Sequence, residues 1–334
     1  EWKKSLPLYR ELLRERKKGK DLYPAYLENL DQGASQFETM FEYFHRPSSE
    51  KIYIIGEKGS FWLSPWLRLG VKMTEEVYRK QARLLPVPVS LLLMTHSVAA
   101  EVFYGDSVSF LAEWTSNYYV RTAFQEMKFE ERFHRGMLDH RMSFQVGHVS
   151  RDPVEALVQR GRVNRWQTIN TLTFRERLKG GNDIFYEWYS MDPSRNWMNG
   201  SSDLGYKLTN DCFVELVLWK KPYLSMNYHY RLGQWRRPFG DAETLIGYLP
   251  YEQAHYGGFY MEERFCQYFG VNWSVTRGSD RKRKVDYLIW NFHGDFYLRD
   301  HVKMSFSYEF DYGDSGTAGP GNSQIFTTTL KAYF

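Results

Sequence analysis

The chain has 334 residues, a net charge of only +4 and no long basic run interleaved with aromatic side chains, so its composition does not favour nucleic-acid binding. Its mean hydropathy is −0.58, and its best apolar run, Leu84–Met94, is too short for a membrane-spanning helix and contains two prolines. The only cysteines, Cys212 and Cys266, lack metal-ligand spacing, and we expect neither a metal, a cofactor nor a structural disulfide.

Aromatic residues make up 18% of the chain, as 25 Tyr, 23 Phe and 11 Trp. Their rings are apolar, while Tyr and Trp also carry a polar end, which suits them to a membrane–water interface. Transmembrane β-barrels carry girdles of such residues and hide their apolar positions by alternation. The composition therefore favours a barrel.

Residues 2–18 have a helical period, with Leu6, Tyr9, Leu12 and Leu13 among charged residues, and Gly19 ends the pattern. Residues 21–32 then link this amphipathic helix to the rest of the chain. We expect two parts: a periplasmic helix and linker over 1–32, and a barrel over 33–334.

From Ala34 onward the apolar period is two. In Lys303–Asp311, for example, four aromatic or apolar residues beginning with Met304 alternate with polar ones. This pattern alone also fits a soluble β-sandwich. The connections favour the barrel, because short turns and longer polar segments alternate, which is the asymmetry of outer-membrane barrels. Short turns are expected at 64–65, 105–106, 134–138, 179–182, 220–222, 266–268 and 299–301. Longer segments are expected at 46–50, 80–86, 115–119, 150–162, 191–204, 235–253, 278–283 and 313–322.

The breaks leave sixteen segments, so the sequence predicts an all-β, antiparallel, up-and-down transmembrane barrel of about 16 strands. The strands are expected at 34–45, 51–63, 66–79, 87–104, 107–115, 120–133, 139–149, 163–178, 183–190, 205–219, 223–234, 254–265, 268–277, 284–297, 302–312 and 323–334. The last alternates up to Phe334, which resembles the assembly signal of bacterial outer-membrane proteins. The expected location is the bacterial outer membrane.

Four segments carry a resemblance to a known family: Glu1–Gly19, Leu63–Gly70, Lys221–Tyr228 and Tyr248–Glu252. The first resembles one helix of a tetratricopeptide repeat, and the others resemble turn-and-strand patterns of the exopolysaccharide export porins. The resemblance implies a monomeric barrel that exports a secreted polysaccharide passively, without catalysis. It also implies a periplasmic arm that contacts an inner-membrane polysaccharide synthase complex. Alternatively, Glu1–Gly19 is only an entry helix, since repeats need about three units to be stable.

Alternation places the polar residues inside the predicted barrel, because a charge on the lipid face costs about 2–4 kcal/mol near the midplane. Their expected roles are bracing the barrel by cross-strand ion pairs or forming a polar track for a sugar chain, helped by Phe124, Phe185 and Tyr189. The predicted pore-lining residues are Arg68, Lys72, Glu101, Glu113, Glu126, Lys128, Glu130, Arg132, Arg141, Arg175, Glu187, Glu215, Asn227, His229, Arg231, Glu262, Arg264, Lys303, Glu309 and Lys331.

Two loops are candidate gates, either folding into the pore or covering its rim. The first contains Asp152, Pro153 and Arg160, where Asp-Pro is typical of a helix start. The second contains Arg236, Arg237, Phe239, Tyr248 and Tyr251. Near another outer loop, the basic run Arg281–Lys284 suggests contact with lipopolysaccharide phosphates, or a solvated loop.

Two other functions remain open. A general or substrate-selective diffusion porin also fits sixteen strands, although the predicted loop at 115–119 is too short for a constriction between strands five and six. An outer-membrane hydrolase would need a catalytic set, for which the sequence offers only Ser225, Asn227 and His229 on one strand face.

Overall fold

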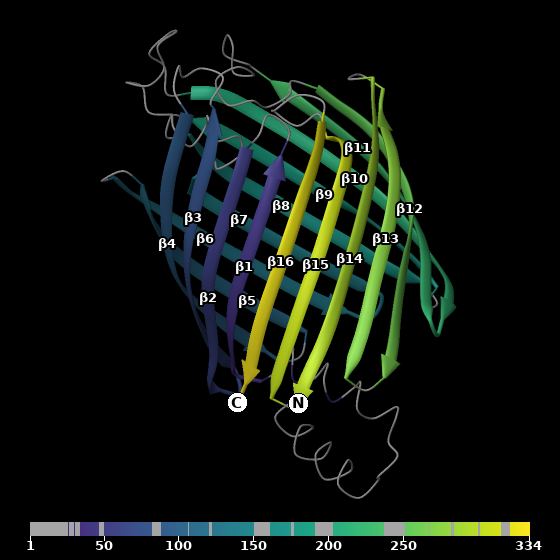
Figure 1. Ribbon diagram of the computed structural model, residues 1–334, viewed down its shortest axis with the longest axis horizontal. Helices are drawn as coiled ribbons and strands as arrows, with labels where there is room; N and C mark the ends of the chain where they lie inside the picture. Colours follow the sequence, from purple (N-terminus) through teal and green to yellow (C-terminus); the bar gives the residue numbers. More distant parts are fainter. Residues whose placement is uncertain are drawn as a thin grey trace, which may run out of the picture.

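The computed structural model describes residues 26, 30, 34–46, 50–81, 88–105, 107–119, 122–149, 161–174, 177–190, 203–236, 251–266, 268–281, 284–299, 301–314 and 321–334. The chain folds into sixteen antiparallel strands (Figure 1). They are β1 (Gln36–Arg46), β2 (Glu50–Ser64), β3 (Leu67–Gln81), β4 (Pro88–Tyr104), β5 (Val108–Tyr119), β6 (Thr122–Arg135), β7 (Leu138–Val149), β8 (Arg162–Phe174), β9 (Leu178–Ser190), β10 (Asp203–Lys220), β11 (Tyr223–Arg236), β12 (Tyr251–Cys266), β13 (Phe269–Asp280), β14 (Val285–Arg299), β15 (Val302–Asp314) and β16 (Gly321–Tyr333). The predicted strand number and fold class are confirmed.

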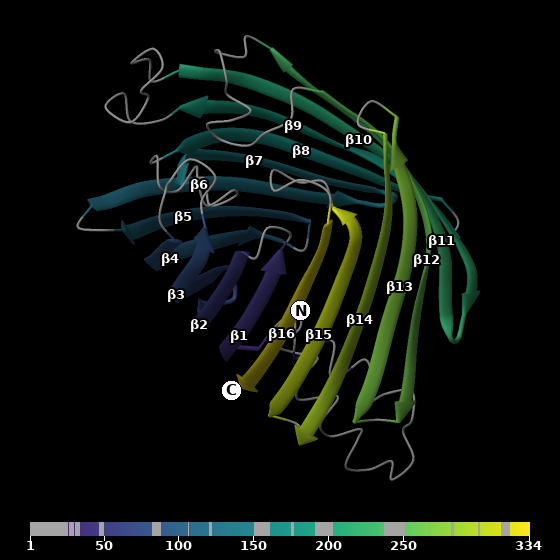
Figure 2. The same cartoon turned by 45° about the horizontal axis from the view of Figure 1, so that its top comes forward.

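The sheet closes on itself. Each strand pairs with its sequence neighbours, and β1 pairs with β16 in a continuous register from Gln36–Tyr333 to His45–Gln324. Figure 2 shows these two strands side by side where the ends of the barrel sequence meet. Closure satisfies the backbone hydrogen bonds of both strands that would otherwise be edges, which a barrel in lipid requires.

The two faces of each strand differ in chemistry. Outward-facing apolar side chains are exposed, as with Val98 on β4 (53% exposed) and Trp290 on β14 (46%), whereas the inward-facing Glu101 is only 4% exposed. This follows from the two-residue period, since neighbouring side chains on a strand point to opposite faces. An exposed apolar wall around a closed barrel is the surface that lipid covers, so the chain is an outer-membrane barrel.

Among the described residues, no helix is long and apolar enough to cross a membrane. Tyr26 and Leu30 are helical and buried, and the Ala34 amide donates to the Leu30 carbonyl oxygen at 3.1 Å. Helical structure therefore occurs in the segment predicted as a linker. The predicted helix over residues 2–18 lies outside the described residues.

The expected loop at 115–119 is wrong, because β5 continues to Tyr119. Polar residues there are engaged across the sheet rather than in a loop: Thr115 bonds Ser97 at 2.8 Å, and Thr95 donates to Asn117 at 2.9 Å. Tyr119 pairs with Thr122, so only two residues connect β5 to β6. This connection also departs from the predicted alternation of short and long loops.

The expected turn at 179–182 is also wrong, since β9 begins at Leu178. Gly180 and Gly181 suggested a turn, but both lie within the strand. A Cβ on Gly181 would lie 2.0 Å from the backbone oxygen of Asn170 and 3.0 Å from two ring atoms of Phe213, so both neighbouring strands approach this glycine closely. A glycine inside a strand commonly marks such a close approach.

Candidate functional site

The inward face forms a continuous polar wall, which we call the inner wall. Strand registers connect its members directly: Arg68 lies opposite Glu101, Lys128 opposite Glu113, and Lys331 opposite Lys303. Every predicted pore-lining residue lies on this face except Arg175, which is outside the described residues. That they line a conducting pore stays a prediction.

A first network on the inner wall centres on Glu130 of β6. Its fully buried carboxylate contacts Lys128 at 2.8 Å, Arg132 at 2.6 Å and Arg141 at 2.7 Å. Lys128 and Arg132 lie two residues before and after it on β6 and share its face, because side chains two residues apart on a strand point the same way. Arg141 comes from the neighbouring strand, β7. One carboxylate thus holds three predicted lining cations together.

A second network lies nearer the short-turn end. Arg68 of β3 donates from Nε to Glu101 at 3.1 Å and makes a second, shorter contact through Nη2. Ser109 donates to the other Glu101 oxygen at 3.2 Å. The Arg68 guanidinium also lies 5.5 Å from the ring centroids of both Trp62 and Phe103. Planarity lets one guanidinium bind a carboxylate and stack on rings at once.

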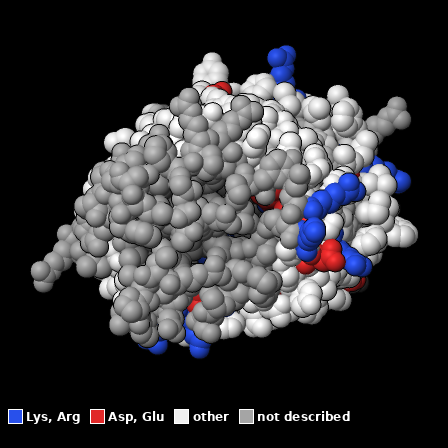
Figure 3. All heavy atoms as spheres, turned by 90° about the horizontal axis from the view of Figure 1, so that it is seen from above, with Lys and Arg blue, Asp and Glu red and all other residues white. Residues whose placement is uncertain are grey.

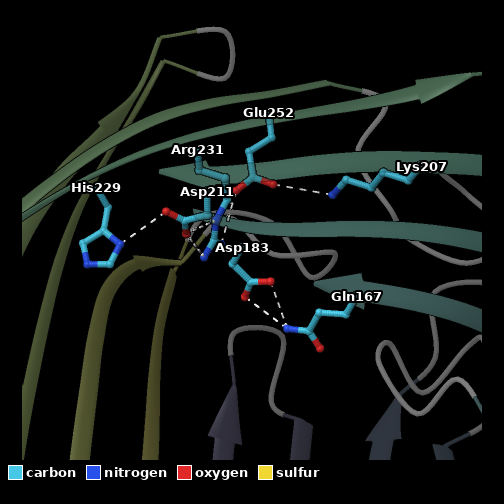
Figure 4. Close-up of polar contacts among 7 residues, drawn as sticks. All are labelled: Gln167, Asp183, Lys207, Asp211, His229, Arg231 and Glu252. Carbon is cyan, nitrogen blue, oxygen red and sulfur yellow. Dashed lines mark hydrogen bonds and ion pairs between the residues drawn. The ribbon is translucent and has the colours of Figure 1, made fainter. Parts of the chain in front are cut away.

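The third network spans β8 to β12 and is drawn in Figure 4. Arg231 donates to Asp211 Oδ2 at 2.8 and 3.0 Å, while His229 Nδ1 lies 3.2 Å from Asp211 Oδ1. Arg231 also lies 3.6 Å from Glu252, which contacts Lys207 at 3.5 Å.

Asp183 lies directly opposite Asp211 and accepts both bonds from the Gln167 amide, at 3.0 and 3.1 Å (Figure 4). The network drawn there holds three carboxylates (Asp183, Asp211, Glu252) and two permanent cations (Arg231, Lys207). Its net charge is therefore −1 while His229 is neutral.

Other predicted residues make smaller contacts. Lys303 lies 3.2 Å from Asp295, and Lys331 lies 3.3 Å from Glu38 across the β1–β16 seam. Glu187 accepts from Arg165 at 2.6 Å, and Glu215 accepts from Tyr223 at 2.8 Å. Glu126 contacts His148 at 3.1 Å. The remaining predicted lining residues share the inner wall but lie outside the three networks: Lys72, Glu113, Asn227, Glu262, Arg264 and Glu309.

The sequence analysis missed Asp183, Asp211 and Glu252. Asp183 adjoined a supposed turn, and Glu252 lay in a supposed loop at 235–253, although β12 already begins at Tyr251. Asp211 could have been predicted from the two-residue period of the strand. It is four residues from the predicted Glu215 on β10 and therefore points to the same face.

The gating predictions concern mostly residues outside the described ones, namely Asp152, Pro153, Arg160, Arg237, Phe239 and Tyr248. Arg236 and Tyr251 are described and are not in a loop. Arg236 ends β11 and Tyr251 begins β12, because the strand pairing continues past the predicted ends. Whether the intervening loop gates the barrel stays a prediction.

Space lies along one side of the inner wall. Cavities of 440 and 760 Å³ border β1 to β8 and share Arg68, Glu101 and Arg132. Figure 3 shows the end of the barrel where β1 finishes, with most of the charged side chains in view at the rim. A barrel of sixteen strands is wide enough for an aqueous interior.

The positions of Ser225 and His229 do not fit a serine hydrolase site. That side chain is held by Asp211 and stacks on Phe213, with ring centroids 5.7 Å apart. Ser225 is four residues away on the same extended strand, which places its backbone roughly 13 Å from that of His229. A serine nucleophile and its base must lie within hydrogen-bond reach.

No family model matches the chain, and no curated protein matches it. Solved structures do. A "Bacterial polysaccharide outer membrane secretin" aligns with a TM-score of 0.68 at 8% identity, covering 90% of this chain and 98% of that one. The CymD monoaromatic hydrocarbon channel aligns at 0.45 and 9% identity, covering 95% and 93%. OccAB3 of Acinetobacter baumannii aligns at 0.46 and 9% identity, covering 90% and 99%.

The likeness at a TM-score of 0.68 shows a shared fold. Together with the closed register and the apolar outer surface, it places the chain among the sixteen-stranded outer-membrane β-barrels.

Proposed function

We propose that this barrel is a passive outer-membrane conduit for a secreted exopolysaccharide, related to the tetratricopeptide-containing export porins. The observation that carries the proposal is the inner wall, whose acidic and basic groups are largely paired with one another. Paired charges still offer hydrogen-bonding edges to hydroxyl groups but hold no ion strongly. Weak and repeated contacts of this kind let a polymer move without being trapped.

Two further observations support the proposal. One solved structure that shares the fold is named as a polysaccharide outer membrane secretin. In addition, the two-residue connection between β5 and β6 leaves no length for the inward-folded constriction expected of a diffusion porin at that place. In this proposal, a periplasmic arm receives polymer from an inner-membrane synthase complex, and the barrel performs no chemistry.

The test is conductance of the purified chain in planar bilayers, with oligosaccharides added to either side. We expect stable channels that one class of sugar blocks reversibly. Stable channels indifferent to every sugar would support the alternative, a general or substrate-selective diffusion porin. A chain that inserts and never conducts would contradict both.

A further inference from the structure

One transverse row of the inner wall is aromatic. The register runs straight across six strands, from Gly181 (β9) through Phe213, His229, Tyr256 and Gly278 to Tyr287 (β14). We call these four ring-bearing residues the aromatic row. From β10 to β14 the row crosses four strand spacings, or about 19 Å. Because barrel strands tilt by about 35–45°, a row perpendicular to them climbs the wall as it goes round.

Glycines let two of these rings lie close against the wall. A Cβ on Gly278 would come within 2.5 Å of Cδ1 of Tyr256, and one on Gly181 would come within 3.0 Å of the Phe213 ring. The rings are also in contact with others in the row. His229 stacks on Phe213 at an interplanar angle of 25°, and the Tyr256 and Tyr287 centroids are 5.8 Å apart. The row is therefore a fixed set of ring surfaces.

The ring surfaces remain accessible in part. Phe213, His229 and Tyr256 are half-buried, and 36% of the His229 side chain is exposed, while Tyr287 is buried. These half-buried rings face the interior of the barrel, where there is no apolar core for them to fill. Such a surface suits a ligand with a flat apolar face and a polar edge.

Polar groups border the row on the side toward the outer end of the strands. Asp183, Asp211 and Arg231 occupy the next inward positions of β9, β10 and β11. Their network, with Glu252 and Lys207, has a net charge of −1 while His229 is neutral (Figure 4). A densely anionic polymer would be repelled here, whereas hydroxyl or ammonium groups would find carboxylate acceptors.

We propose that the aromatic row with its bordering carboxylates is a saccharide-binding subsite, on which pyranose rings of a neutral or amino-sugar polymer, rather than a polyuronate, stack as they pass. The subsite rests on the proposed export function and narrows it to a class of cargo. Ring stacking is tolerant of exact position, so it guides a chain without fixing its register.

The test uses the full chain in planar bilayers, with neutral β-1,4-glucose hexamers, β-1,6-N-acetylglucosamine hexamers and a uronate hexamer as blockers. Tyr256→Leu and Phe213→Leu are expected to shorten the dwell time of a neutral blocker between about twofold and tenfold, the range of one aromatic contact. Tyr260→Leu is the matched control, because Tyr260 is on the same strand and face but two inward positions away from the row. It should change the dwell time little, and the uronate should block more briefly than the neutral sugars.

Different failures have different meanings. If no sugar blocks the unmodified channel, both the proposed function and the subsite are overturned. If neutral sugars block but the dwell times in the two row variants match those in Tyr260→Leu, the subsite is wrong while the export function stands. A uronate that blocks as long as the neutral hexamers overturns the cargo class alone. Folding of each variant is checked by its heat-modifiable mobility in gels, and His229→Ala replaces a variant that does not fold.

Discussion

Glu130 should be a major electrostatic brace of the barrel. Its carboxylate is fully buried and accepts contacts from Lys128, Arg132 and Arg141 at 2.6 to 2.8 Å. The substitution Glu130→Gln keeps the shape of the side chain and removes its charge. Three cations on neighbouring positions of β6 and β7 then face one another without their shared counterion.

The expected cost follows from these contacts. A hydrogen bond to a charged group contributes about 1.5–3 kcal/mol, so three such contacts would give a gross loss of about 4.5–9 kcal/mol. The cations, however, are 25%, 51% and 42% exposed and regain contact with water when released. Screening of partly exposed pairs therefore reduces the loss. We expect a destabilisation of about 2–4 kcal/mol, near the value for breaking a buried ion pair by removing one partner.

The assay is urea unfolding of the purified barrel in lipid vesicles, followed by tryptophan fluorescence and gel mobility. Glu113→Gln is the matched control, since it removes the same charge from the same face one strand away, at a half-buried position. The Glu130 variant should unfold at a clearly lower urea concentration than the control. Equal midpoints for the two variants would refute the reasoning that one buried carboxylate organises the three cations.

Three other outcomes are expected. Val98→Arg places a charge on the outer wall and should lower the free energy of unfolding in vesicles by about 2–4 kcal/mol. Ala99→Arg places the same charge beside the 440 Å³ cavity and should lower it much less. The reverse order would show that the two faces are assigned the wrong way round. Arg68→Lys keeps the charge but loses the fork on Glu101 and the ring stacking, so the thermal midpoint of the gel-mobility shift should fall, and an unchanged midpoint would contradict the role of planarity. Asp183→Asn takes the β8–β12 network from −1 to 0, so the reversal potential in a KCl gradient should shift toward anions, and no shift would show that Asp183 does not face the ion path.

Strand number and face assignment were predictable because both depend on local alternation. A charged residue between two apolar neighbours, such as Glu101 between Ala100 and Val102, has its face fixed by the period of two alone. Closure was predictable less directly, from the even number of segments.

The errors arose where a local signal has two physical causes. Gly180-Gly181 is typical of a turn, but here the backbone oxygen of Asn170 and the ring of Phe213 lie too close to Gly181 for a side chain. Polar residues at 115–117 suggested a loop, but their partners are on adjacent strands, and no local pattern identifies a partner 18 or 22 residues away. The networks around Asp211 and Glu130 depend on register between strands in the same way, so their residues were predictable individually and their contacts were not.

The inner wall reconciles two requirements that oppose each other. A wide barrel needs strong cross-strand contacts to resist deformation, whereas a conduit needs a surface that holds its cargo weakly. Pairing Glu130 and Asp211 with cations from their own and neighbouring strands meets the first requirement and satisfies the strongest hydrogen-bonding groups within the wall. In the proposed export function, a passing sugar would compete with contacts already made, so each of its polar contacts would be weak. In the proposed subsite, the aromatic row would add attraction that does not depend on such competition and would orient the sugar chain without stopping it.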